Sequence, residues 1–205
     1  MSLARDERSD LADFLRTLSP RQWEAQSLCA GWRVRDVVAH VISYDELDRR
    51  ALVRRFAKGL LRPGGPNAVG LREYGMRSPD ELLALLRAHL EPTGLPAAFG
   101  GSVALVDGLI HHQDIRRPLG MPRAIPAERI LPVLRHTLTS PRLLGFWRVR
   151  GLRLAASDLD WSVGRGPEVR GPAEALLMAI AGRRGVAGEL TGPGVVTLAR
   201  RIEGP

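Results

Sequence analysis

Apolar residues recur at intervals of three or four positions along the first two thirds of the chain, a spacing that places them on one face of an α-helix. This pattern predicts four main helices, over about residues 3–18, 34–58, 79–90 and 102–117. A further short helix is predicted over residues 127–138, where Pro132 interrupts the pattern. Four main helices joined by loops favour an antiparallel helical bundle.

Residues that start and stop helices support these boundaries. Ser78 precedes Pro79 and stands three positions before Glu81, which predicts an N-cap, a first-turn proline and a capping box. Pro118 follows the last of the four main helices and ends it. Between the second and third helices, the segment RPGGPNAVG predicts a flexible break.

The pattern changes after about residue 145. Three candidate strands follow, in the segments WRVRGLRLAA, DLDWSVG and PEVRG. The next segment, GPAEALLMAIAGR, is typical of a helix. We therefore predict a mainly α protein, with a helical bundle over residues 1–140 and a small α+β domain over residues 145–205.

Composition indicates a soluble globular protein. Hydrophobic residues make up 44% of the 205 positions and charged residues 25%, which is ordinary for such a protein. No apolar run is long enough to span a bilayer, and the opening MSLARDERSD lacks the apolar stretch of a secretory signal, so we expect a cytoplasmic protein. Cys29 is the only cysteine, which excludes an internal disulfide and a cysteine-based zinc site.

The formal net charge is +8, and the basic residues are nearly all arginines, with Lys58 as the only lysine. A basic protein can bind nucleic acid. Here the arginines are spread along the chain among acidic residues, and few aromatic residues are present to stack on bases, so we expect no nucleic-acid partner. The preference for arginine over lysine indicates a GC-rich genome, such as that of an actinobacterium.

Two segments about 65 residues apart carry the candidate chemistry. Asp107 and His111 are four residues apart and share one helix face, and Asp114 adds a polar group one turn further on. In the second predicted helix, His40 lies on the same stripe as apolar residues such as Val37. Polar groups on apolar faces are costly to bury unless something satisfies them. Two imidazoles and a carboxylate can hold zinc or another transition metal with an open position, where a bound water or thiol becomes a nucleophile.

The same residues allow a structural interpretation. A histidine on an apolar face is often a hydrogen-bonded core residue, and an Asp-x-x-x-His pair occurs by chance on many helices. His112 is an alternative ligand, although it lies about 100° around the helix from His111. We expect Cys29 to be a small core residue and not a nucleophile. Trp32 is expected to close the end of the bundle.

The segments WEAQSLCAGWRVRDVVAHV and VDGLIHHQDIRRPLG, which carry these residues, resemble the mycothiol-dependent maleylpyruvate isomerase family, within the DinB-like metal-binding bundles. The tail VRGPAEALLMAIAGRRGVAGELTGPGV resembles the small C-terminal domain of that family, which is similar to sterol-carrier-type α+β folds. The resemblance covers nearly the whole chain. It implies a DinB-like four-helix bundle followed by the small domain.

The resemblance also implies chemistry. It places a divalent metal, commonly zinc, on His40, Asp107 and His111, with Asp107 standing where glutamate is common. The metal would bind the thiolate of mycothiol, which would attack an electrophilic small molecule and give isomerisation or S-transfer. The family directs an arginine of the small domain toward the active-site cleft, and Arg183 is the best match, where it could pair with a substrate carboxylate. A solvated arginine at a helix C-terminus is the alternative for Arg183.

Two other functions stay open at this point. Water could replace the thiol on the metal, which would make the protein a metal-dependent hydrolase on the same scaffold. Alternatively, the histidines and aspartate could form a structural network in a non-catalytic protein that binds a small ligand. In each case we expect a small-molecule partner, no membrane partner, and a monomer or homodimer.

Overall fold

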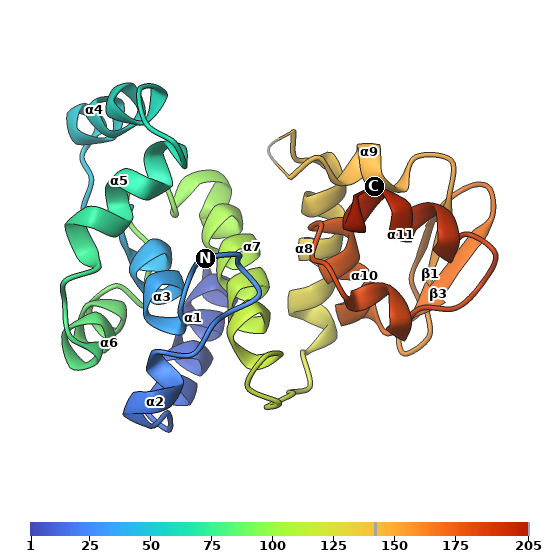
Figure 1. Cartoon of the computed structure of the whole chain (residues 1–205), viewed down its shortest axis with the longest axis horizontal. Helices are drawn as coiled ribbons and strands as arrows, with labels where there is room; N and C mark the ends of the chain where they lie inside the picture. Colours follow the sequence, from blue (N-terminus) through green and yellow to red (C-terminus); the bar gives the residue numbers. More distant parts are fainter. Residues whose placement is uncertain (142, 205) are drawn as a thin grey trace. The chain divides into compact units, whose positions relative to one another are not determined.

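The computed structural model describes residues 1–141 and 143–204, and the chain divides into two compact units, Met1–Pro122 and Arg123–Pro205 (Figure 1). The first unit is all helical, and the second combines helices with a small sheet. This confirms the predicted fold class, a helical bundle followed by a small α+β unit. Among the described residues, no helix is long and apolar enough to cross a membrane.

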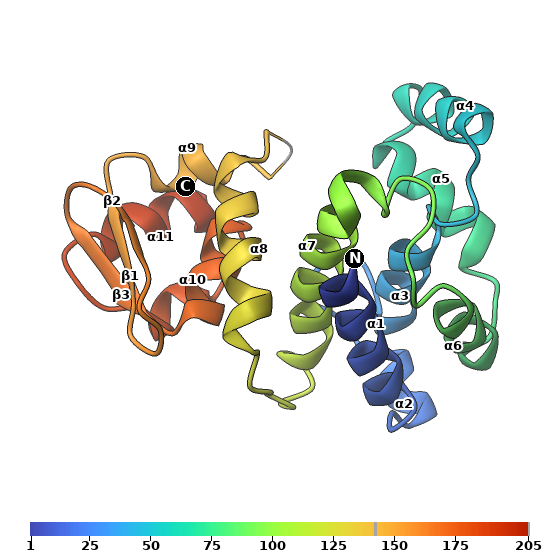
Figure 2. The same ribbon diagram turned by 180° about the vertical axis from the view of Figure 1, so that it is seen from behind.

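The first unit contains seven helices within its described range: α1 (Ser2–Leu15), α2 (Pro20–Trp23), α3 (Val34–Ile42), α4 (Arg49–Leu60), α5 (Gly65–Tyr74), α6 (Pro79–Ala88) and α7 (Ala98–Arg116). Four of them form the bundle, because α1 packs on α6 and α7, and α3 packs on the same two helices (Figures 1 and 2). Helices α4 and α5 pack on each other, and α5 also packs on α3. These four bundle helices begin close to where the apolar pattern predicts them.

The bundle core is built from the apolar stripes that the sequence predicts. Leu11 and Leu15 of α1, Val37 of α3, and Leu82 and Leu86 of α6 are all buried in one cluster. Each fully buried side chain of this size contributes roughly 1.5–3 kcal/mol relative to an exposed one. The bundle therefore supplies a rigid frame for polar side chains that α3 and α7 direct inward.

Helix α6 begins as predicted. The Ser78 hydroxyl accepts a hydrogen bond from the Glu81 amide at 3.2 Å, and the Glu81 carboxylate accepts one from the Ser78 amide at 2.6 Å. In α7 the residues Phe99–Gly101 have left-handed backbone angles, and regular helix follows from about Ser102, the predicted start.

The second predicted helix was wrong in its length. We expected it to run from residue 34 to residue 58, but α3 ends at Ile42 and α4 begins only at Arg49, after its N-cap Asp48. The break places Asp45 inside the molecule, where its carboxylate forms two hydrogen bonds of 2.9 and 3.0 Å with the buried Arg8 guanidinium. Apolar spacing alone did not reveal this break, because the apolar residues continue through it.

The expected flexible break at residues 62–70 was also wrong in part, because α5 begins at Gly65. Gly64 occupies the N-cap position with φ 82°, a left-handed conformation that glycine adopts without steric cost. Pro66 stands in the first turn, where its missing amide hydrogen is not needed. The glycines and proline that suggested a break thus form the start of a helix.

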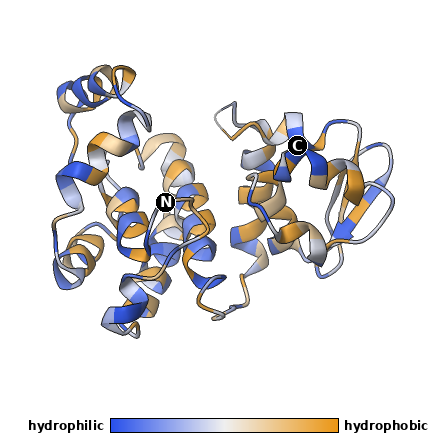
Figure 3. Cartoon of the chain, in the orientation of Figure 1, coloured by the Kyte–Doolittle hydropathy of each residue, from blue (hydrophilic) through white to orange (hydrophobic). Residues whose placement is uncertain are grey.

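The second unit contains α8 (Ala127–Thr139), α9 (Gly145–Val149), β1 (Arg153–Ala156), β2 (Ser162–Gly164), β3 (Glu168–Gly171), α10 (Ala173–Ile180), the 3₁₀ turn η1 (Val186–Glu189) and α11 (Val195–Glu203). The strand order is β2-β1-β3, with β1 antiparallel to β2 and parallel to β3. The residues of helix α10 are mostly hydrophobic, as the colouring in Figure 3 shows. The helix is accordingly buried along its length and packs on α8, α9 and β1. It forms the core of this unit.

Two expectations for this part of the chain differ from the structure. The helix predicted over residues 127–138 was placed with the bundle, but α8 packs on α9 and α10 and lies in the second compact unit, which begins at Arg123. Residues 147–149, included in the first candidate strand, lie in helix α9. An amphipathic pattern shows that a helix has a buried face, but it does not show which core covers that face.

Candidate metal site

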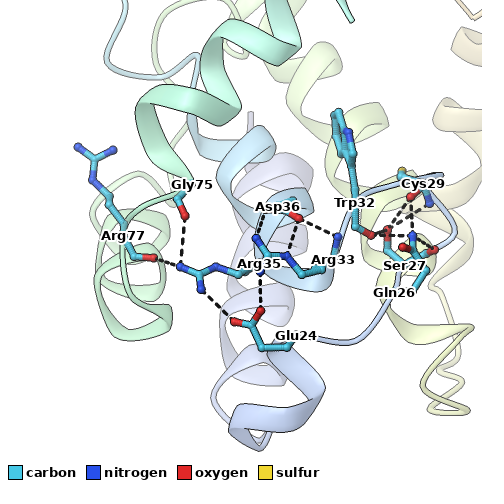
Figure 4. Close-up of polar contacts among 10 residues, drawn as sticks. All are labelled: Glu24, Gln26, Ser27, Cys29, Trp32, Arg33, Arg35, Asp36, Gly75 and Arg77. Atoms are coloured by element: carbon cyan, nitrogen blue, oxygen red, sulfur yellow. Dashed lines mark hydrogen bonds and ion pairs between the residues drawn. The ribbon is translucent and has the colours of Figure 1, made fainter.

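Helix α3 carries His40, and its start is held by an ion-pair network (Figure 4). The Arg33 amide donates to the Asp36 carboxylate at 2.9 Å, which closes the first turn of α3. Glu24 accepts hydrogen bonds from Arg33 at 2.7 Å and from Arg35 at 2.9 Å. These contacts tie the helix to the preceding segment, so the position of His40 two turns further on is well defined.

The loop before α3 is also held in one conformation. The Gln26 side-chain amide donates to the backbone carbonyls of Ser27, Cys29 and Trp32, and the Ser27 hydroxyl donates to Trp32 at 2.8 Å (Figure 4). The Cys29 amide in turn donates to the Ser27 hydroxyl at 3.1 Å. The loop therefore fixes the directions in which the side chains of Cys29 and Trp32 leave the backbone.

Helix α7 brings the predicted acid and histidine to the same place. The Asp107 carboxylate oxygen Oδ1 lies 3.4 Å from His40 Nε2 and 3.5 Å from His111 Nε2. The two imidazole rings meet edge to face, with their centroids 4.9 Å apart. Residues 40, 107 and 111, which the sequence predicts as metal ligands, therefore converge from two helices.

The two separations between Asp107 Oδ1 and the imidazole nitrogens fit a metal site better than a hydrogen-bond network. Good hydrogen bonds between nitrogen and oxygen are about 2.7–3.2 Å long, so both contacts of Asp107 are longer than that. Ligand atoms about 2.0–2.1 Å from a tetrahedral zinc lie about 3.3–3.4 Å from one another, close to the separations found here. In addition, His40 Nδ1 is buried and has no hydrogen-bond partner among the described residues, unlike a satisfied core histidine. The donors thus fit a divalent metal.

Asp114 orients one of the two imidazoles. Its buried carboxylate accepts a hydrogen bond from His111 Nδ1 at 2.9 Å, and its backbone carbonyl accepts one from the Leu28 amide at 2.9 Å. A proton held on Nδ1 leaves Nε2 of His111, on the other side of the ring, free to bind a metal beside Asp107. Cys29 Sγ lies 3.2 Å from the same Asp114 oxygen and donates to it.

The charges at this site influence one another strongly. Burial alone would raise the pKa of Asp107, but the imidazoles of His40 and His111 outweigh burial and hold this pKa well below its usual range. Burial alone would lower the pKa of His111, but the Asp107 carboxylate and the hydrogen bonds raise it well above its usual value. Without a metal, the raised pKa of His111 therefore favours a protonated imidazole, whose positive charge balances the Asp107 carboxylate.

Aromatic rings border the site. The Trp32 ring lies 5.2 Å from the His40 ring and 6.4 Å from the His111 ring, measured between centroids. The Tyr44 ring meets His40 edge to face at 6.0 Å. Asp107 keeps 37% of its side-chain surface exposed, whereas His40 and His111 are nearly buried. Aromatic rings therefore lie beside the two imidazoles, and Asp107 is the most exposed of the three candidate ligands.

The remaining histidines lie elsewhere. His112, the alternative ligand, is fully buried, its Nδ1 pairs with Glu7 at 2.9 Å, and its Nε2 accepts a hydrogen bond from Arg116 at 2.8 Å. It therefore belongs to a polar network of the bundle core and not to the site. His89 ends helix α6, and His136 lies on α8 of the second unit.

Arg183, the residue proposed to pair with a substrate, follows helix α10 in the second unit. Its amide donates to Met178 at 2.9 Å, and its side chain is half-buried. Burial, together with the charge of Arg183, lowers the pKa of the Arg148 guanidinium, so the two cations are neighbours. A contact between Arg183 and the metal site stays a prediction from the resemblance.

Two contributors to this site were missing from the sequence interpretation. Asp114 was seen as an extra polar group, but its role behind His111 was not assigned, and Cys29 was taken for a small core residue. The spacing of three residues between His111 and Asp114 was the available signal, since it places them on neighbouring positions of one helix face. For Cys29 the sequence held no signal, because its contact with Asp114 joins residues 85 positions apart.

The fold and the three donors define a class of protein, a helical bundle with a candidate mononuclear metal site, followed by a small α+β unit. Residues 4–94 match the model of the mycothiol maleylpyruvate isomerase N-terminal domain family, so the chain carries this domain in its first unit. A search of curated proteins finds no match.

Two solved structures share the fold of almost the whole chain. The crystal structure of the mycothiol-dependent maleylpyruvate isomerase matches with a TM-score of 0.64 and 19% sequence identity, covering 94% of this chain and 90% of that one. A variant of that enzyme with a histidine replaced by alanine matches with the same values. The resemblance seen in the sequence segments thus agrees with a domain match over residues 4–94 and with a fold shared over almost the whole chain.

Proposed function

We propose that this protein is a metal-dependent enzyme that uses mycothiol, or a closely similar low-molecular-weight thiol. It either isomerises an electrophilic small molecule with the help of the thiol or transfers the thiol, through its sulfur, to that molecule. The convergence of His40, Asp107 and His111 at the spacing of zinc ligands carries the proposal. The thiol is proposed from the domain family, whose name includes mycothiol. We place the activity in the cytoplasm, where low-molecular-weight thiols are kept reduced.

Each residue of the site has its own proposed role. A divalent metal bound there, zinc by preference, would lower the pKa of a coordinated thiol and so would supply a thiolate at neutral pH. His40 Nε2, His111 Nε2 and the Asp107 carboxylate would hold that metal, and Asp114 keeps the His111 ring in the orientation that presents Nε2. Trp32 limits water on its side of the two imidazoles.

Arg183 is proposed to bind a substrate carboxylate through its planar guanidinium, an assignment based on the resemblance alone. Arg183→Lys keeps the charge but removes the paired donors, so it should raise KM for a carboxylate substrate more than for an uncharged electrophile. An equal effect on both substrates would contradict this role.

Turnover assays with the zinc-loaded protein test the proposal. Maleylpyruvate and a thiol-reactive aryl chloride are supplied with and without mycothiol, with His111→Ala as the inactive variant and His136→Ala as the matched control outside the site. Turnover that requires mycothiol and is lost in His111→Ala is the expected result. Ester hydrolysis without any thiol would favour the hydrolase, and ligand binding without turnover in any assay would favour a non-catalytic protein.

A further inference from the structure

Helix α4 exposes a stripe of apolar side chains to solvent. Val53, Leu60 and Leu61 keep 68%, 88% and 88% of their surface exposed. Val53, the exposed Ala57 and Leu60 occupy positions i, i+4 and i+7 on one face of α4, and Leu61 follows as its C-cap residue. The opposite side of α4 packs on α5, where Gly59 stands against Pro66. The stripe is thus a second, unpartnered apolar face.

Positive charge surrounds this stripe. No acidic residue occurs between Asp48 and Glu73, whereas seven basic residues do: Arg49, Arg50, Arg54, Arg55, Lys58, Arg62 and Arg72. Arg55 is buried and pairs with Glu73, but the other basic residues of this stretch are exposed, and within the described part of the chain they form no ion pair. Figure 3 shows hydrophobic and hydrophilic residues side by side along this helix.

We propose that α4 docks on the surface of a membrane that contains anionic lipids. Such a surface takes up exposed leucines and neutralises arginines and lysines at the same time, which is how interfacial amphipathic helices bind. A second copy of the chain would bring one positive face against another. A nucleic acid would pair with the cations but leave Leu60 and Leu61 in water.

The proposed contact at the lipid surface differs from a membrane-spanning segment, which is the kind of membrane contact that the sequence argues against. We expected no membrane partner because no segment is long enough to span a bilayer, but a helix lying at the lipid surface needs only one apolar face. The cytoplasmic leaflet carries the negative charge that such a helix requires.

Vesicle co-sedimentation tests the docking. One set of vesicles is pure phosphatidylcholine, and the other contains one third phosphatidylglycerol. The wild type should bind the anionic vesicles, and both Leu60→Ser/Leu61→Ser and Arg54→Gln/Lys58→Gln should weaken partitioning by about tenfold or more. Val196→Ser/Arg200→Gln, which removes an exposed apolar residue and a cation from α11, is the matched control and should bind like the wild type.

Several results would overturn this proposal. Equal binding to both kinds of vesicle, or none to either at low salt, would exclude an anionic lipid surface. Full binding by the serine variant would show electrostatic attraction without apolar docking. A dimer that the serine variant abolishes would assign the stripe to a second copy of the chain, and competition by oligonucleotide alone would assign it to nucleic acid.

A separate observation concerns Cys29. The loop that holds it points Sγ at the buried Asp114 carboxylate, 3.2 Å away, and the same oxygen accepts the His111 Nδ1 hydrogen bond at 2.9 Å. One carboxylate oxygen therefore receives two donors, from the loop and from helix α7. The His111 to Asp114 distance is that of a hydrogen bond and is shorter than the separations at the candidate metal site.

We infer that Cys29 is a positioning residue, which holds Asp114 so that Asp114 holds the metal ligand His111. This inference rests on the proposed metal site. Groups that orient ligands in this way typically change metal affinity by about 10–100-fold when they are removed. Cys29→Ala removes the donor, whereas Cys29→Ser keeps a hydroxyl donor at the same position and is the matched rescue variant.

Zinc competition titrations and cobalt absorption spectra test this role. Cys29→Ala should bind zinc about tenfold more weakly and shift the visible cobalt spectrum, and Cys29→Ser should restore both. Equal affinity in wild type and Cys29→Ala would refute the positioning role while leaving the metal site intact. A thiolate-to-cobalt band in the wild type would instead make Cys29 a direct ligand, and a wild type without metal affinity would refute the site as well.

Discussion

Metal affinity should depend steeply on pH, because a proton and a metal compete for His111. In the metal-free protein the Asp107 carboxylate and the hydrogen bonds raise the pKa of His111 well above its usual value. Metal binding requires an unprotonated Nε2, so this proton must leave. Asp107 has a pKa held well below its usual range and is already ionised, so it releases none.

The release of one proton on metal binding sets the size of the pH dependence of the affinity. The apparent binding constant should rise about tenfold per pH unit, about 1.4 kcal/mol, until the pH reaches the pKa of His111. For an ordinary histidine this rise would end near pH 6.5, whereas the raised pKa of His111 should carry it to higher pH. Chromophoric chelator competition between pH 6 and pH 9, corrected for chelator protonation, measures the slope.

The control is His136→Ala, which removes a histidine outside the site and should keep both the affinity and the slope. An affinity that is flat above pH 6.5 in the wild type would refute the reasoning, because it would show that no proton is retained on His111. A slope that survives in His111→Ala would assign the released proton to another group.

The same pKa shifts predict how the stability of the metal-free fold, and its increase on adding zinc, change with pH. The raised pKa of His111 stabilises the metal-free fold below the ordinary histidine pKa, and this contribution is lost as the pH rises through the raised value. The lowered pKa of Asp107 stabilises the fold above the ordinary aspartate pKa, and this contribution is lost as the pH falls through the lowered value. The increase in Tm on adding zinc should therefore grow with pH.

Three further predictions concern single residues. Arg8→Met leaves the buried Asp45 carboxylate without its cation and should lower the free energy of unfolding in urea by about 3–5 kcal/mol. The exposed Arg16→Met is the control and should change this free energy by less than about 1 kcal/mol. Equal effects of the two variants would contradict the importance of the buried pair. Ser78→Ala removes the N-cap of α6 and should cost about 1 kcal/mol in the same assay, with an unchanged midpoint counting against the cap. Asp107→Asn exchanges an anionic ligand for a neutral one and should reduce zinc affinity by about tenfold or more while the fold persists, so wild-type affinity would remove Asp107 from the site.

The sequence predicted best what local chemistry determines. Ser78, Pro79 and Glu81 specify the start of α6 by themselves, because the capping box involves only neighbouring residues. The four-residue spacing of Asp107 and His111 likewise places both on one helix face wherever the helix packs. Both features therefore appear in the structure where the sequence placed them.

Features that depend on distant residues were harder to predict. The end of α3 at Ile42 is accompanied by the burial of Asp45 against Arg8, a residue 37 positions away, and apolar spacing does not report such a pair. Helix α8 shows a clear apolar face, but its partner is the α10 core of the second unit, a choice that only tertiary packing makes. The contact of Cys29 with Asp114 is of the same kind.

The most direct test of the account is the metal content of the purified protein after loading with zinc and removal of the excess. Elemental analysis should find close to one zinc per chain in the wild type and in His136→Ala, and little in His40→Ala and His111→Ala, with all four proteins folded by circular dichroism. Zinc-free wild type, or equal zinc in wild type and His111→Ala, would contradict the central claim that His40, Asp107 and His111 form a metal site.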